Sequence, residues 1–135
     1  MTPAVREVLV VDDDPLIRDV LRTILDLEEF EVRLAEDGEH ALAAVDERVP
    51  QVVVCDVKMP GIDGYEVCRR LKAAPETAAV PVILLTARDR AEDRAAGVAA
   101  GCDAYVTKPF SPLHLIEVIG QVGAGAASRS TVGES

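Results

Sequence analysis

The sequence predicts a doubly wound α/β domain, in which helices cover both faces of a parallel sheet. Five short runs of apolar, largely β-branched residues recur along the chain, and each is followed by a segment of helical character. Strands this apolar, joined by helical crossovers, are typical of a parallel sheet with right-handed connections. The predicted strands are Glu7 to Val11, Glu31 to Ala35, Val52 to Cys55, Val82 to Thr86 and Ala104 to Thr107.

Four of the five predicted helices carry an apolar stripe. Two of them also begin with a capping signal, because Asp14-Pro15 and Ser111-Pro112 each place an acceptor at the N-cap and proline at the first helical position. Asp14 is therefore assigned to capping rather than to a metal site. The stripes are Leu16, Ile17, Val20, Leu21, Ile24 and Leu25; Leu42 and Val45; Val67 and Leu71; and Leu113, Ile116 and Ile119 to Val122.

The fourth helix and the C-terminal end of the chain carry weaker signals. Ala91 to Ala100 is rich in alanine and contains Gly97, and a glycine inside a helix costs about 1 kcal/mol relative to alanine. We expect this helix to be the loosest element. Gly123 to Ser135 consists mainly of Gly, Ala and Ser, so the domain is predicted over residues 5–122 and a flexible tail or truncated linker over residues 123–135.

Composition narrows the class of protein. A chain of 135 residues suits one domain, and a formal net charge of −10 without a Lys/Arg run argues against direct nucleic-acid binding. The apolar runs are far shorter than the roughly 20 residues that span a bilayer, so a cytoplasmic protein is expected. Cys55, Cys68 and Cys102 lack metal-ligand spacing and are interpreted as reduced packing thiols. His40 and His114 lack acidic or Cys partners at ligand spacing and are expected to be solvated.

Carboxylates follow two of the predicted strands. Asp12 and Asp13 come directly after the first strand and Asp56 after the third, and the carboxyl ends of parallel strands form the edge where open α/β sheets bind ligands. Clustered carboxylates repel one another, and a hard cation such as Mg²⁺ can neutralise them while also binding a phosphate oxygen. Thr86 and Lys108 would bring a hydroxyl and an ammonium group to the same edge, where both can hold phosphoryl oxygens. Magnesium-dependent phosphate chemistry is therefore predicted.

These residues stand within four motifs that together resemble the response-regulator receiver family. The motifs occur in the family's order, and the match covers roughly residues 7 to 122. The resemblance implies a single flavodoxin-like (βα)5 domain with the strand order 2-1-3-4-5. The motifs are Val10-Val11-Asp12-Asp13; Asp56-Val57-Lys58-Met59-Pro60-Gly61-Ile62-Asp63-Gly64; Leu84-Leu85-Thr86-Ala87; and Tyr105-Val106-Thr107-Lys108-Pro109-Phe110.

The resemblance also implies a role for each polar residue of the edge. Asp56 would be the nucleophile that becomes an aspartyl phosphate, and Mg²⁺ the cofactor. Asp13 would bind Mg²⁺ directly and Asp12 chiefly through water, while Lys58 would contribute its backbone carbonyl. Lys108 would pair with the phosphoryl group.

A two-state switch is implied as well. Thr86 would donate its hydroxyl to the phosphoryl group, Tyr105 would turn inward as Thr86 moves, and the Lys108-Pro109 peptide bond would be cis. Lys58 and Arg88 occupy places that tune the rate of dephosphorylation in the family. We further expect Asp56, Thr86 and the fourth helix to be coupled, because elements that move come from the least stable part of a structure.

Such a receiver takes its phosphoryl group from a sensor histidine kinase or a phosphotransfer protein. It signals to a downstream effector protein or through an effector domain missing from these residues. It would not count as an enzyme, because it catalyses only its own phosphorylation and dephosphorylation.

Two other functions share parts of the pattern. A haloacid-dehalogenase-type phosphatase would use Asp12 of Asp12-Asp13-Asp14 as its nucleophile, but that family needs further acidic metal ligands after the lysine, and Asp56 would be left unexplained. A flavodoxin-like FMN carrier would share the architecture, but its phosphate loop is rich in hydroxyl groups and glycine where this chain has acids.

Overall fold

Strands and helices alternate strictly along the chain. The computed structural model describes the backbone of residues 6–87 and 91–134, and the side chains of these residues as far as residue 124. The strands are β1 (Glu7–Val11), β2 (Glu31–Ala35), β3 (Val52–Asp56), β4 (Val82–Thr86) and β5 (Ala104–Thr107). The helices are α1 (Pro15–Leu27), α2 (Gly38–Glu47), α3 (Gly64–Ala73), α4 (Ala91–Ala100) and α5 (Pro112–Glu134).

The strands form one five-stranded parallel sheet in the order β2-β1-β3-β4-β5. The α/β class, the flavodoxin-like topology and the strand order are therefore confirmed. The predicted strands coincide with the observed ones, except that β3 continues for one more residue and ends at Asp56.

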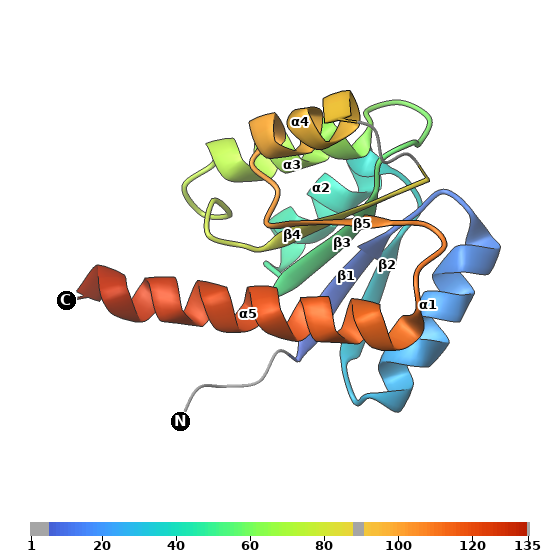
Figure 1. Ribbon diagram of the computed structural model, residues 1–135, viewed down its shortest axis with the longest axis horizontal. Coiled ribbons are helices and arrows are strands. Elements are labelled where there is room, and N and C mark those ends of the chain that lie inside the picture. Colours follow the sequence, from blue (N-terminus) through green and yellow to red (C-terminus); the bar gives the residue numbers. More distant parts are fainter. Residues whose placement is uncertain (1–5, 88–90, 135) are drawn as a thin grey trace.

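The helices divide between the two faces of the sheet. Figure 1 shows α2, α3 and α4 on one face and α1 and α5 on the other. Because successive strand residues point to opposite faces, each strand supplies side chains to both layers of the core. Leu9, Val53 and Leu84 pack under α2, α3 and α4, whereas Val10 and Val54 pack under α1 and α5.

Local polar contacts fix where the helices begin. The Asp14 side chain accepts a hydrogen bond from the Leu16 amide at 2.9 Å, and the Ser111 hydroxyl accepts one from the His114 amide at 3.0 Å. Both predicted N-caps are thereby confirmed. Gly97 in α4 has a packing explanation, because an added Cβ would lie 3.0 Å from the ring of Tyr105.

The last helix differs from the prediction. Residues 123–135 are predicted to form a flexible tail or truncated linker, whereas α5 continues without interruption from Pro112 to Glu134 and extends past the sheet (Figure 1). Alanine favours helix and the segment contains no proline to end it, so the helix already begun by Pro112 can propagate through it. Among the helices in the described ranges, none is long and apolar enough to cross a membrane.

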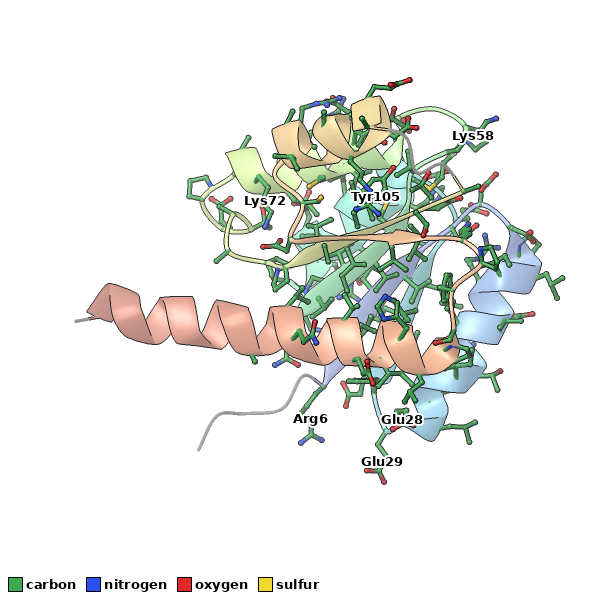
Figure 2. All side chains as sticks on the ribbon, in the orientation of Figure 1. Arg6, Glu28, Glu29, Lys58, Lys72 and Tyr105 are labelled. Atoms are coloured by element: carbon green, nitrogen blue, oxygen red, sulfur yellow. The ribbon has the colours of Figure 1, made fainter. Side chains whose placement is uncertain are left out.

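Lys72 connects three segments at the amino end of β4. Its ammonium group lies 2.8 Å from the Asp103 carboxylate and donates to the Val80 carbonyl at 2.7 Å (Figure 2). The same Asp103 oxygen accepts a hydrogen bond from the Val82 amide at 2.8 Å. The Lys72 and Asp103 side chains are only 20% and 12% exposed, so this ion pair is shielded from water and joins α3 to the loops that enter β4 and β5.

Replacing Lys72 should therefore destabilise the domain. We expect Lys72→Met to lower the free energy of unfolding by about 2 kcal/mol, because it leaves a largely buried carboxylate without its cation. Lys58→Met, at an exposed lysine, is the matched control and should change it by less than about 0.5 kcal/mol. Urea unfolding measures both, and equal stability of the two variants would contradict this account.

Candidate functional site

The predicted carboxylates gather at the carboxyl edge of the sheet. Val11 of β1 is paired with Cys55 of β3, so Asp12 and Asp56 come next on neighbouring strands. Oxygen atoms of Asp12, Asp13 and Asp56 all lie within 4.8 Å of one another. This edge lies at the point where the order of the strands reverses between β1 and β3, as expected for a ligand site.

The three carboxylates differ in their surroundings. Asp12 is 1% exposed and Asp56 is 7% exposed, whereas Asp13 is open to solvent. Lys108 places its ammonium group 3.2 Å from Asp56 Oδ1 and 3.6 Å from Asp12 Oδ2. One oxygen of Asp12 accepts a hydrogen bond from the Asp14 amide, but the other, Oδ2, is buried without a hydrogen-bond partner among the described residues.

These surroundings change the acidity of Asp56. Burial raises the pKa of this carboxyl above its ordinary value, and the negative charge of Asp12 raises it further. Lys108 acts in the opposite direction, but the net pKa shift remains upward. The site therefore holds more negative charge than its lysine offsets.

The residues present fit a magnesium ion. The donor set consists of oxygen atoms, which Mg²⁺ prefers, and one or two carboxylates with water and phosphate oxygens complete its usual shell. The buried Asp12 Oδ2 lacks a hydrogen bond from any residue that the structure describes, and a cation would compensate the cost of burying it. The acidic cluster is thus compatible with Mg²⁺ binding, and the assignment of individual ligands stays a prediction.

A cavity of about 470 Å³ opens beside Asp56. Lys58, Thr86 and Lys108 line it with Asp56, so all four predicted residues share one space. Thr86 is 5% exposed at the end of β4. Tyr105 does not line this cavity but lies between β5 and α4 (Figure 2).

Further contacts and backbone features define this edge. The Arg18 guanidinium donates to the Asp12 carbonyl at 2.6 Å and so fixes the loop after β1. Gly64 lets α3 begin directly against the end of β3, because an added Cβ would lie 2.5 Å from the Asp56 carbonyl oxygen. The Lys108-Pro109 bond is cis, as the family resemblance implied. Arg88 lies outside the described residues.

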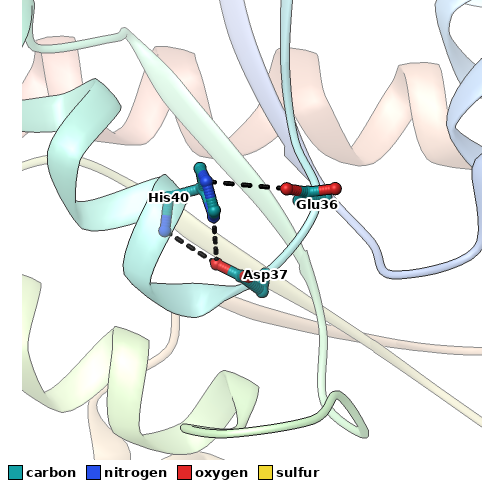
Figure 3. A group of neighbouring side chains, drawn as sticks. All are labelled: Glu36, Asp37 and His40. Carbon is teal, nitrogen blue, oxygen red and sulfur yellow. Dashed lines mark hydrogen bonds and ion pairs between the residues drawn. The ribbon is translucent and has the colours of Figure 1, made fainter.

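A second polar group lies at the start of α2. His40 Nδ1 is 2.8 Å from Asp37, and its Nε2 is 3.5 Å from Glu36 (Figure 3). The expectation that His40 lacks acidic partners is therefore wrong, because Glu36 and Asp37 precede it by one helical turn. The two carboxylates contact different ring nitrogens, and His40 remains 63% exposed. We interpret the group as a helix cap with a paired histidine.

Comparison with known proteins identifies the family. Residues 8–120 match the family model of the response regulator receiver domain. The protein belongs to this family. The resemblance inferred from the four sequence motifs is thereby confirmed.

Named relatives agree with this assignment. An uncharacterized 14.6 kDa protein of Leptolyngbya boryana is 42% identical over 120 residues, which make up 89% of this receiver chain and 92% of that protein. Response regulator MprA of Mycobacterium sp. strain KMS is 45% identical over 109 residues, 81% of this chain but 46% of MprA. The chain thus spans about half the length of MprA. The structure of Vibrio cholerae chemotaxis protein CheY4 has a TM-score of 0.83 and 31% identity, and covers 88% of this chain and 99% of its own.

The upward pKa shift predicts how Asp56 affects the stability of the receiver. The pKa of the Asp56 carboxyl is higher in the folded protein than in the unfolded chain. This group therefore favours folding most at a pH below its pKa in the unfolded chain, and the contribution is lost as the pH rises through its pKa in the folded protein. We expect Asp56→Asn to be more stable than the wild type at pH 7, with the difference shrinking as the pH falls toward 4. Thermal unfolding between these pH values measures it.

Asp14→Asn is the matched control for this experiment. Asp14 is exposed, and asparagine retains the capping oxygen at this position. A stability difference of the same size and pH dependence in both variants would contradict an effect specific to Asp56.

The group at α2 generates a second pH prediction. The hydrogen bond and negative charge of Asp37 raise the pKa of His40. Asp37→Asn removes the charge but keeps a good N-cap, so the pKa of His40 should fall. NMR titration of the imidazole measures this pKa, and the His114 signal should be unaffected by the substitution. An unchanged His40 pKa would show that the pair does not persist in solution.

Proposed function

We propose that the receiver accepts a phosphoryl group on Asp56 from a phosphohistidine of a sensor kinase or phosphotransfer protein. The observation that carries the proposal is the position of Asp56, buried at the end of β3 between the Lys108 ammonium group and two further carboxylates. Asp56 also borders the cavity that contains Thr86 and Lys58, where a phosphoryl group would have room.

The transfer follows from the chemistry of these groups. An Asp56 carboxylate oxygen attacks phosphorus, the new P–O bond forms as the P–N bond to the donor imidazole breaks, and the imidazole takes up a proton as it leaves. Lys108, already 3.2 Å from Asp56, offsets negative charge on the transferring group. Positioning and electrostatics therefore supply most of the catalysis.

Asp12, Asp13, Asp56 and the backbone carbonyl of Lys58 would hold Mg²⁺, with Asp12 acting chiefly through water. When bound, Mg²⁺ would supply positive charge that offsets the crowded carboxylates and phosphoryl oxygens. The buried Asp12 Oδ2, which lacks a hydrogen bond among the described residues, supports this assignment.

The phosphorylated state would differ in shape from the free one. An aspartyl phosphate adds a charge of about −1.5 to −2, by analogy with other phosphorylated side chains. Thr86, at 5% exposure on the cavity wall, can donate its hydroxyl to this group. We infer that Tyr105 turns inward as Thr86 moves, and that α4 responds.

This activity gives the receiver a signalling role. It would act in the cytoplasm, catalyse only its own phosphorylation and dephosphorylation, and pass the signal to an effector protein or effector domain. Support comes from relatives named as regulators, among them the phosphate regulon transcriptional regulatory protein PhoB of Rhizobium meliloti, of which the matched region forms 48%.

Intact mass spectrometry after incubation with acetyl phosphate tests the proposal. Wild-type protein should gain one phosphoryl group in the presence of Mg²⁺, and the gain should be abolished in Asp56→Asn. The gain should also fall sharply when Mg²⁺ is removed by a chelator, because the crowded carboxylates then repel the donor. Asp14→Asn, outside the cluster, should be labelled like the wild type.

The same experiment separates the alternatives. Labelling that survives in Asp56→Asn and is lost in Asp12→Asn would favour the haloacid-dehalogenase-type phosphatase. No labelling of the wild type by acetyl phosphate, nor by a phosphorylated histidine phosphotransfer protein, would contradict the proposed function.

A further inference from the structure

Tyr65 has no role in the proposed phosphotransfer, yet it lines the same cavity as Asp56. It is the second residue of α3 and follows Gly64, whose position is fixed by close approach to the Asp56 carbonyl. The Gly64 amide also donates to the Val57 carbonyl at 2.8 Å. The backbone of Tyr65 is therefore held tightly to the end of the phosphoacceptor strand.

The Tyr65 side chain reaches from this fixed point to α4. Its hydroxyl donates to the Asp93 carbonyl at 3.1 Å, in the first turn of α4. Asp93 lines the cavity as well, so the contact links α3 to α4 at the wall of the cavity. Burial raises the pKa of the Tyr65 hydroxyl well above its ordinary value.

Tyr105 makes its own contacts with α4. Its ring lies so close to Gly97 that an added Cβ would be 3.0 Å from it, and the Arg94 guanidinium is 5.2 Å from the ring centroid. Tyr65, Tyr105 and Arg94, here called the tyrosine cluster, thus join α3, β5 and α4 at one point.

We propose that Tyr65 is a positioning residue of the switch, whose hydroxyl holds the first turn of α4 and, through α4, the Tyr105 side chain in the arrangement described here. The proposal rests on the phosphorylation-dependent switch proposed above, but the contact between the Tyr65 hydroxyl and the Asp93 carbonyl exists without phosphorylation. Loss of the hydroxyl should release α4 and, with it, Tyr105, because the Tyr105 ring packs against Gly97 and Arg94 of the same helix.

The composition of the chain makes this testable by fluorine NMR. The chain has two tyrosines, and both belong to the tyrosine cluster, so 3-fluorotyrosine labelling should give two resonances. Tyr65→Phe keeps the ring, removes only the hydroxyl, and leaves the Tyr105 resonance alone in the spectrum. Without any phosphodonor, we expect this resonance to move from its wild-type position toward the one it takes after acetyl phosphate and Mg²⁺ are added to the wild type.

Amide hydrogen exchange supplies the second measurement. Exchange across α4 should be about five-fold faster in Tyr65→Phe than in the wild type, the effect expected from losing one hydrogen bond. Val98→Ala is the matched control, because Val98 is a 76% exposed residue of α4 outside the tyrosine cluster. It should leave both the Tyr105 resonance and α4 exchange close to wild type.

The outcomes keep the two proposals apart. If the Tyr105 resonance and α4 exchange are the same in Tyr65→Phe and wild type, the role of Tyr65 is overturned, whether or not Asp56 is phosphorylated. If phosphorylated wild type, verified by mass, shows no change at either tyrosine, Tyr65 is not part of the switch. Failure of the mass gain itself would count against the phosphoacceptor function, and the unphosphorylated spectra would still decide whether Tyr65 holds Tyr105 and α4.

Discussion

Mutual repulsion among Asp12, Asp13 and Asp56 is the constraint on which the rest of the domain depends. Their oxygens lie within 4.8 Å of one another, and two of the three residues are almost fully buried. Lys108 offsets part of this charge from the end of β5, and the pKa of Asp56 still lies above its ordinary value. A folded chain keeps such an arrangement only if its packing elsewhere stabilises the fold by more than this electrostatic repulsion destabilises it.

The sheet supplies that packing. Every residue of β3 and β4 is buried, and both faces are covered by helices, so the strand ends that carry Asp56 and Thr86 are fixed in position. The β1 end is held by the Arg18 contact with the Asp12 carbonyl. The candidate site is thereby confined to one edge of the sheet, while the packing that stabilises the fold is spread over the rest of the domain.

The sequence was sufficient for the architecture because the strands are short, apolar and separated by helices with clear stripes. It also placed Asp12, Asp56, Thr86 and Lys108 at one edge, since parallel strands carry their carboxyl ends together. Other features depend on contacts between distant segments. The link from Tyr65 to Asp93 joins residues on different helices, and no local pattern encodes it. The length of α5 does not follow from composition, because the segment after Val122 is rich both in glycine, which disfavours a helix, and in alanine, which favours one.

The fixed end of α4 determines what motion this helix can make. Cys68 of α3 contacts the Ala100 carbonyl at 3.3 Å through its thiol, and the Lys72–Asp103 ion pair holds the chain just beyond. Toward the opposite end, α4 is held by the Tyr65 hydroxyl and by the contact of Arg94 with the Tyr105 ring. We infer that, if α4 moves, it would pivot about the end at Ala100, with a displacement that grows toward Ala91. A partner protein that distinguishes the two states of this domain would therefore discriminate best by binding the first turn of α4, where the displacement would be largest.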